Sequence, residues 1–192
     1  MSRIFVMSDP HFNHNREFIY KARGFNIVEE MNETIIANVN SVVGADDELY
    51  ILGDVCLGGG GNEVSAKNKA LIERLNGRIH IILGNHDTPQ RIAMYTNCEN
   101  VYSATEYATM LHYNGYHFYL SHFPTITGNL EKESLKKCTL NLFGHTHQTT
   151  NFYQDMPFVY HVGVDSHNCY PVLLDDIIEE MHAKVKECFE QI

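Results

Sequence analysis

The chain has 192 residues, a length typical of one domain. Its composition, 44% hydrophobic and 20% charged, fits a folded protein with a sizeable core. The formal net charge of −10 argues against broad attraction to nucleic acid or to anionic membranes. A nucleic-acid partner would therefore need a local basic groove.

The cysteines and the apolar runs bear on the cellular compartment. The five cysteines are scattered and form no CxxC pair, which argues against a disulfide framework or a structural zinc site. The first apolar run is short and ends at Asp9, so it does not resemble a signal peptide. No run approaches the length of a transmembrane helix. These features predict a cytoplasmic protein with no membrane partner.

The first half of the chain alternates strand and helix patterns. Residues 4–8, 49–52 and 79–83 are short apolar runs that end at polar or glycine residues, which is typical of buried strands. Residues 29–43 and 63–75 carry apolar side chains at helical spacing. A strand–helix–strand–helix–strand order predicts parallel strands joined by right-handed crossovers.

The second half has a different pattern. Asn114-Gly115 separates two apolar runs and predicts a β-hairpin. A closing amphipathic helix is expected over residues 176–189. The predicted strands of this half cover residues 107–112, 116–120, 139–143, 158–162 and 172–174. Together the two halves predict one α/β domain, with either one mixed sheet or two stacked sheets.

Histidine, aspartate and asparagine residues gather where the predicted strands end. Ligands bind beyond the carboxyl ends of strands in open α/β sheets, because loops from different strands converge there. Carboxylate oxygens together with imidazole nitrogens suit zinc, manganese or iron better than calcium or magnesium. The clusters are Asp9-Pro10-His11, Gly53-Asp54, Gly84-Asn85-His86-Asp87, Ser121-His122 and Gly144-His145-Thr146-His147. Their pattern favours a metal-dependent hydrolase.

These five clusters, in this order, resemble the calcineurin-like metallophosphoesterase family along the whole chain. The opening residues 9–14 and the segment Arg23-Gly24-Phe25 are similar to a small single-domain branch found in bacteria and phages. The resemblance implies one domain over residues 1–192. It also implies a metallophosphoesterase-type αββα sandwich, in which helices flank two mixed β-sheets.

The resemblance also implies a role for each clustered residue. Two divalent metal ions are expected, with manganese first and iron, zinc or nickel as alternatives. His86 would face the leaving group as an acid or a transition-state stabiliser, and Asp87 would orient the His86 imidazole. The ligands of the first metal would be Asp9, His11 and His147; those of the second would be Asn85, His122 and His145; and Asp54 would bridge the two.

The expected charges indicate a class of substrate. Two divalent ions, two carboxylates and a bridging hydroxide would leave the centre at about +1. A positive centre in a strongly acidic protein would attract a single phosphate. We therefore expect small phosphoesters as substrates, with diesters preferred to monoesters. Two alternatives remain open: a non-catalytic interaction module on the same fold, and a nuclease. The complete set of ligands counts against the first and the acidic balance counts against the second.

Several other features have simpler interpretations. Gly58-Gly59-Gly60-Gly61 lacks the Gly-Lys-Ser/Thr of a P-loop and is read as a flexible loop beside the site. Cys56 is expected to be a buried filler. The remaining histidines are read as surface residues, although a place at the rim of the site is open for His161 and His167.

Overall fold

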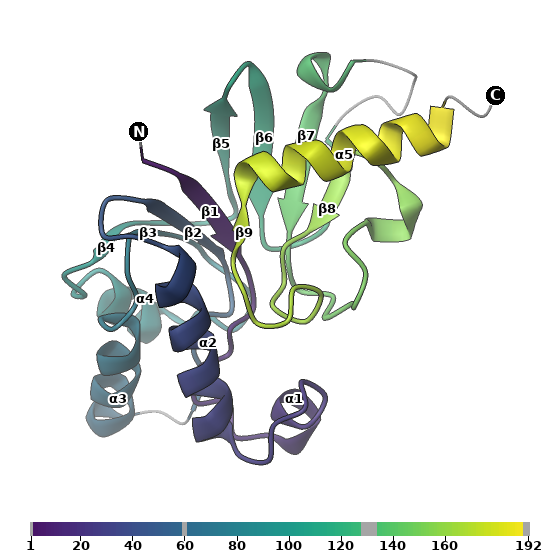
Figure 1. Ribbon diagram of the computed structural model, residues 1–192. Coiled ribbons are helices and arrows are strands. Elements are labelled where there is room, and N and C mark those ends of the chain that lie inside the picture. The colour runs from purple at the N-terminus through teal and green to yellow at the C-terminus, as the bar shows by residue number, and fades with distance from the viewer. Residues whose placement is uncertain (1, 59–60, 128–133, 190–192) are drawn as a thin grey trace.

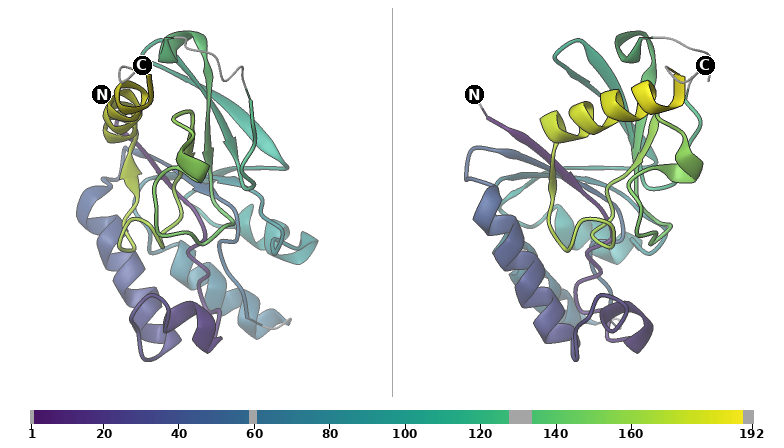
Figure 2. Two further views of the ribbon diagram at one scale, coloured as in Figure 1. Left: turned by 90° about the vertical axis from the view of Figure 1, so that its right-hand side faces the viewer. Right: turned by 45° about the vertical axis from the view of Figure 1, so that its right-hand side comes forward.

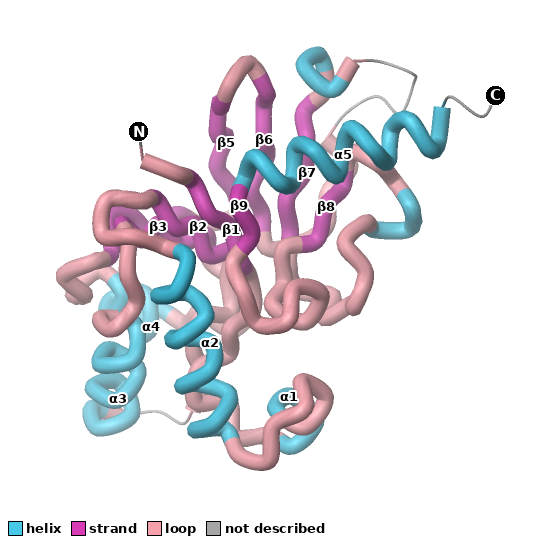
Figure 3. Tube along the Cα trace, in the orientation of Figure 1, coloured by secondary structure: helices cyan, strands magenta, loops and turns pink. Residues whose placement is uncertain are grey.

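The computed structural model describes residues 2–58, 61–127 and 134–189, and these residues contain two β-sheets (Figures 1 and 3). One sheet has the strand order β4-β3-β2-β1-β9 and the other β5-β6-β7-β8. The strands are β1 Ile4–Met7, β2 Glu48–Leu52, β3 Arg78–Ile82, β4 Val101–Thr105, β5 Ala108–Tyr113, β6 Tyr116–Ser121, β7 Thr139–Phe143, β8 Val159–His161 and β9 Val172–Leu173. The α-helices are α1 Glu17–Tyr20, α2 Val28–Val42, α3 Asn62–Ile72, α4 Pro89–Tyr95 and α5 Leu174–Phe189. This is the predicted α/β fold with two mixed sheets.

The five-stranded sheet is built from the strands predicted in the first half of the chain. Strand β1 pairs in parallel with β2, and β2 pairs in parallel with β3. Helices α2 and α3 make the crossovers, so the predicted alternation of strand and helix is confirmed. On the far side of β1, β9 pairs antiparallel, which makes this sheet mixed.

Three elements of this half were not predicted: the one-turn helix α1, helix α4 and strand β4. Helix α4 begins after Thr88, whose side chain accepts a hydrogen bond from the Arg91 backbone, and Pro89 occupies its first turn. The helix has seven residues and buries Met94 and Tyr95. It is too short for its apolar residues to repeat at helical spacing, so the sequence pattern does not reveal it. Strand β4 lies at the sheet edge and is partly exposed, so its sequence lacks a continuous apolar run.

The four-stranded sheet contains the predicted hairpin. Strands β5 and β6 pair antiparallel, with Tyr113 opposite Tyr116. Asn114 and Gly115 between them have φ values of 50° and 81°. Two consecutive positive φ values are those of the type I′ turn that Asn-Gly favours. Strands β7 and β8 continue the sheet in parallel.

Two apolar cores hold these layers together. The first lies between the five-stranded sheet and helices α2, α3 and α4. The second joins the other face of that sheet, through Val6, Leu52 and Ile82, to the four-stranded sheet and α5. Figure 2 shows that α5 lies on the side of the four-stranded sheet, away from α2, α3 and α4. Within the described ranges, no helix has the length and apolar character needed to span a bilayer.

The two sheets meet at the carboxyl ends of their strands. Ser8, just after β1, forms a parallel bridge with Gly163, just after β8. The Val164 amide donates to the Ser8 carbonyl oxygen at 3.0 Å, and the Asp9 amide donates to the Gly53 carbonyl oxygen at 3.2 Å. Loops from both sheets are therefore joined directly, and the polar clusters lie on these loops.

Candidate metal centre

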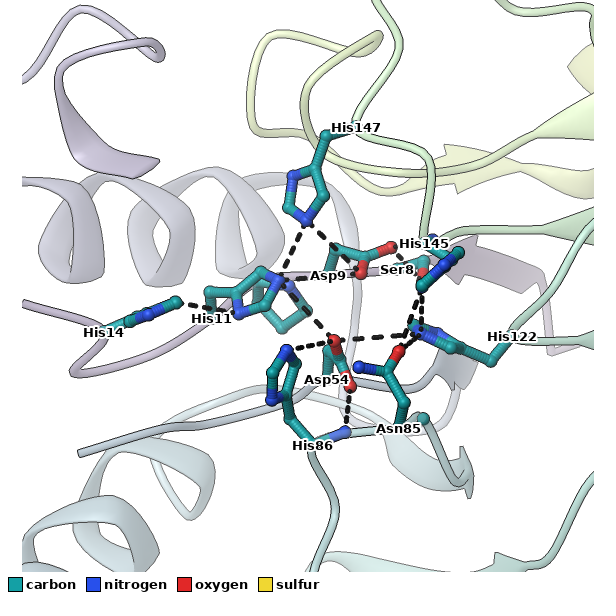
Figure 4. A network of polar contacts seen from close by, with 12 residues as sticks. Ser8, Asp9, His11, His14, Asp54, Asn85, His86, His122, His145 and His147 are labelled. Carbon is teal, nitrogen blue, oxygen red and sulfur yellow. Dashed lines mark hydrogen bonds and ion pairs between the residues drawn. The ribbon is translucent and has the colours of Figure 1, made fainter. Parts of the chain in front are cut away.

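The structure gathers all seven predicted metal ligands in one place (Figure 4). Each of them follows the carboxyl end of a strand. Asp9 and His11 follow β1, Asp54 follows β2, Asn85 follows β3, His122 follows β6, and His145 and His147 follow β7. Four of the seven side chains belong to residues that are almost completely buried, namely Asp9, His11, Asp54 and His122.

The backbone at these positions is sharply bent. Five of the seven residues have positive φ: Asp9, His11, Asp54, His145 and His147, with values between 49° and 66°. This conformation is uncommon for residues other than glycine. It occurs most often at functional sites, where contacts with the surrounding structure stabilise it. The bends turn side chains from two sheets toward a common centre.

One group of donor atoms surrounds a point between His11 and His147. Their Nε2 atoms lie 3.1 Å apart. Asp9 Oδ1 lies 3.6 Å from His11 Nε2 and 3.8 Å from His147 Nε2, and Asp54 Oδ2 lies 3.8 Å from His11 Nε2. Ligands at about 2.1 Å from a tetrahedral metal are separated by roughly 3.4 Å, so this spacing suits a metal ion. Asp9, His11 and His147 can therefore share one cation.

A second group of donor atoms lies beside the first. His122 Nε2 and His145 Nδ1 lie 2.8 and 2.9 Å from Asn85 Oδ1 and 3.2 Å from each other. Asp54 Oδ2 lies 3.7 Å from His122 Nε2. The His122 Nδ1–H can donate to the Leu52 carbonyl oxygen at 2.8 Å, which leaves the Nε2 lone pair facing the group. The same oxygen of Asp54 thus belongs to both groups.

The surroundings of Asp9 are consistent with a cation between these donor groups. Its Oδ2 accepts hydrogen bonds from the Ser8 hydroxyl and the His145 amide, both at 2.7 Å. Its Oδ1 is buried and has no hydrogen-bond partner. Burial alone would raise the pKa of Asp9, but the His11 ring, whose Nε2 lies 3.6 Å from Oδ1, and the charges of nearby histidines lower it to about 2. A charged oxygen without a partner is costly in the interior, and a metal ion would neutralise it.

His147 is held by two residues that the sequence did not indicate. Asp165 Oδ2 lies 3.0 Å from His147 Nδ1, and the Arg23 guanidinium donates to both Asp165 oxygens at 2.9 Å. Burial opposes protonation of His147, but the hydrogen bond with Asp165 and the charge of Asp9 outweigh it and raise the pKa of His147. Arg23 also donates to the backbone carbonyls of Asp9 and Pro10. This arrangement fixes the ring so that Nε2 faces the first donor group.

His86 lies next to the ligands and is half exposed. Its Nε2 is 3.8 Å from Asp54 Oδ2, and its side chain is 48% exposed. Its backbone amide donates to Asp54 Oδ1 at 2.9 Å. The imidazole is therefore close to both donor groups while it remains open to a molecule entering from solvent (Figure 4).

Asp87 has different partners from those predicted. Its Oδ1 accepts from the Tyr95 hydroxyl at 2.6 Å, and its Oδ2 accepts from the Gly84 and Asp54 amides at 2.8 and 3.0 Å. Both oxygens are thus directed to the loop backbone and to α4, which corrects the expectation that Asp87 orients the His86 imidazole. The physical reason is the tight loop, whose buried amides need an acceptor. Asp87 holds the loop in place.

The other singled-out residues fall outside the donor groups. Cys56 is buried, as expected, and lies 3.4 Å from the Tyr95 hydroxyl. His161 is fully buried and its Nδ1 lies 2.8 Å from the Ser166 hydroxyl, so its interpretation as a surface residue is wrong. His167 is partly buried against the His161 carbonyl oxygen. Gly59 and Gly60 of the glycine run lie outside the described residues.

The fold and the clustered carboxylates and imidazoles define a candidate metal-binding α/β protein, and comparison with known proteins places it in a family. The family model described as calcineurin-like phosphoesterase superfamily domain matches residues 2–164. An uncharacterized protein of Methanocaldococcus jannaschii is 35% identical over 188 residues, covering 93% of this chain and 91% of that protein. The Gene 66 protein of Mycobacterium phage L5 is 31% identical, covering 77% of this chain and 78% of that protein.

A solved structure has the same fold. It is a protein of unknown function from Aquifex aeolicus, which matches with a TM-score of 0.68 and 19% identity over 93% of this chain and 99% of that one. The chain belongs to the calcineurin-like phosphoesterase superfamily. The predicted family is therefore confirmed, and so is the fold class.

Proposed function

We propose that the protein is a metal-dependent phosphoesterase with two metal ions, acting on small phosphoesters and on diesters in preference to monoesters. The observation that carries the proposal is the shared oxygen of Asp54. This atom lies 3.8 Å from His11 Nε2 in one donor group and 3.7 Å from His122 Nε2 in the other. A carboxylate oxygen placed between two donor groups in this way can bridge two closely spaced metal ions.

The donor set fits two ions of borderline character. Asp9, His11 and His147 would hold one, and Asn85, His122 and His145 the other. Manganese is our first expectation, with iron, zinc and nickel as alternatives, because each accepts mixed oxygen and nitrogen ligands. When bound, the two ions would supply positive charge to the phosphate and lower the pKa of the attacking water.

The side chains around the ligands have separate tasks. His86 is exposed enough to meet an ester oxygen and close enough to Asp54 to remain in the centre, so it can donate a proton or a hydrogen bond to the leaving group. Arg23 and Asp165 keep His147 in position. Asp87 keeps the loop that carries Asn85 and His86 in position.

The charge of the chain favours small substrates over nucleic acid. A net charge of −10 repels long polyanions, whereas two divalent ions attract a single phosphate. The complete set of donor atoms, with His86 beside it, supports an enzyme over a non-catalytic module on the same fold. A cytoplasmic location remains our expectation from the sequence.

The function is tested by hydrolysis of bis(p-nitrophenyl) phosphate and p-nitrophenyl phosphate by manganese-loaded protein. We expect turnover of both, with the diester faster. His86→Ala should keep its metal content and lose roughly 10²–10⁴-fold in kcat. His112→Ala, which alters an exposed histidine on the distant β5–β6 hairpin, is the matched control and should behave as wild type. Loaded protein that hydrolyses neither ester would favour the non-catalytic module, and full activity in His86→Ala would remove His86 from the mechanism.

A further inference from the structure

A pocket of about 530 Å³ opens directly beside the metal centre. Asn85, one of the candidate ligands, forms part of its wall. The remaining wall comes from the rest of the β3–α4 loop, from α4, from the turn between β4 and β5, from β6 and from the segment that follows β6. It includes Ile92, Glu106, Tyr107, Tyr119 and Phe123. Because Asn85 borders both the second donor group and this pocket, a group attached to a phosphate at the metal centre would lie next to the pocket.

Phe123 links the pocket to the metal centre. Its ring lies 5.0 Å from the His122 ring and 4.5 Å from the His145 ring, measured between centroids, in edge-to-face geometry. The residue is nevertheless 48% exposed, so part of the side chain is open to solvent. An aromatic ring that contacts two candidate ligands and remains open on another side is well placed to contact a bound molecule.

Tyr107 is presented to the pocket in an unusual conformation. It has a φ of 65°, and the Ala108 amide donates to the Glu106 carbonyl oxygen at 2.8 Å across it. A turn this tight, with positive φ at an aromatic residue, is rare and strained. The residue is also 84% exposed, so burial does not compensate for the strain. An exposed aromatic ring kept in a strained turn at a pocket is evidence for a binding role.

The charges of the pocket determine which part of a substrate it can accept. Among its lining residues, Glu106 and Asp87 carry charge and both are acidic. Asp87 already accepts three hydrogen bonds, whereas Glu106 is exposed. A phosphate would be repelled here and would lie at the metal centre. The pocket therefore suits a flat neutral ring that stacks on aromatic side chains and donates N–H groups to a carboxylate.

We infer that this pocket is a subsite for a nucleobase, carried by a small phosphoester whose phosphate lies at the metal centre. The inference rests on the proposed function. Stacking on Tyr107 and Phe123 would supply affinity for any base. Glu106 would favour bases with an amino group on their pairing edge, such as cytosine, over uracil, whose single N3–H on that edge lies between two carbonyl oxygens that repel a carboxylate.

Binding of uncleavable analogues to manganese-loaded protein tests the subsite by calorimetry. The ligands are methylene phosphonate analogues of cytidine 5′-phosphate, uridine 5′-phosphate and ribose 5-phosphate, in which a carbon–phosphorus bond prevents hydrolysis. We expect the cytidine analogue to bind at least about 10-fold more tightly than the ribose analogue. Tyr107→Gly should remove most of this difference, and it should fold because glycine adopts positive φ readily. Tyr102→Ala, at another exposed tyrosine, is the control and should leave the difference intact.

Glu106→Gln should reduce the preference for cytidine over uridine while stacking remains. Equal binding of cytidine and ribose analogues by wild type, or a full base preference in Tyr107→Gly, would overturn the subsite. A ten-residue oligonucleotide that binds more tightly than the cytidine analogue, with strong salt dependence, would overturn the assignment to small esters.

These outcomes separate the subsite from the proposed function, because binding of the analogues requires no turnover. Hydrolysis of phosphodiesters without base discrimination would remove the subsite alone. Base discrimination without hydrolysis of any ester would remove the catalytic proposal and leave a nucleotide-binding site.

Discussion

The Nδ1 atom of His147 lies 3.0 Å from Oδ2 of Asp165, a residue 18 positions further along the chain. This contact sets the orientation of the His147 ring, because Nδ1 carries the proton and Nε2 then faces Asp9 and His11. Asp165 is itself held by Arg23, whose side chain is only 2% exposed. Burial alone would raise the pKa of Asp165, but the hydrogen bonds with His147 and Arg23 lower it well below its usual range. The carboxylate is therefore charged when it acts on the ring.

Replacing Asp165 by asparagine should weaken metal binding. An amide is a poorer acceptor for the Nδ1–H of His147, so the ring loses part of its orientation and basicity. We expect the manganese affinity to fall by about 10–100-fold, as for other carboxylates that support a histidine ligand. Asp155→Asn, at an exposed carboxylate paired with Lys184, is the matched control. Calorimetric titration of metal-stripped proteins measures the effect, and equal affinities would show that Asp165 does not support the site.

Gly144→Ala should disrupt the metal centre, because a side chain at Gly144 would collide with residues that form it. A Cβ at this position would overlap the Ser8 side chain and Oδ2 of Asp9. Asp9 would have to move, so we expect loss of metal binding together with a fall of about 1–3 kcal/mol in the free energy of unfolding. Gly44→Ala is the control, because its Cβ would meet Asp47 Oδ2 at an ordinary 3.4 Å. Urea unfolding of metal-stripped protein gives the stability, and an unchanged value with full metal binding would contradict the close packing described here.

His161 should make the stability of metal-stripped protein depend on pH. Burial lowers the pKa of its imidazole from 6.5 to about 4. Between these two pH values the imidazole is protonated in the unfolded state and neutral in the folded state. The resulting loss in the free energy of unfolding is absent above pH 6.5 and grows as the pH falls toward 4. Between pH 7 and pH 4.5, His161 should remove about 2.5 kcal/mol of stability.

A His161→Gln variant isolates this effect. Glutamine does not titrate, so its free energy of unfolding should fall less between these two pH values, by about the same 2.5 kcal/mol. Other buried histidines contribute equally to both proteins and cancel in the difference. Urea unfolding at the two pH values is the measurement. Parallel pH dependences would mean that His161 is protonated in the folded protein.

The strands and the candidate ligands could be predicted because one physical rule produces both signals. A buried strand is a short apolar run, and its carboxyl end is where the chain turns and polar side chains can converge. Asp9, Asp54 and His122 each follow such a run directly or after one residue. The hairpin can also be predicted from the sequence, because Asn114-Gly115 favours the turn that joins its two strands.

The missed features depend on contacts between distant parts of the chain. Arg23 and Asp165 are 142 positions apart, and neither lies in a metal-ligand cluster. The segment Arg23-Gly24-Phe25 was noticed as part of a resemblance, but its sequence carries no sign of a buried ion pair. The resemblance implies that Asp87 orients the His86 imidazole, as carboxylates beside histidines often do. The structure shows that amides of Gly84 and Asp54 take its hydrogen bonds.

The central claim is a pair of metals bridged by Asp54, and one titration tests it most directly. Metal-stripped protein is titrated with manganese while hydrolysis of bis(p-nitrophenyl) phosphate and bound metal are measured together. We predict that activity rises with loading and saturates at about two ions per chain, and that Asp54→Asn fails to reach this stoichiometry and loses activity. Full activity at one ion per chain, or full loading and turnover in Asp54→Asn, would contradict the bridged pair.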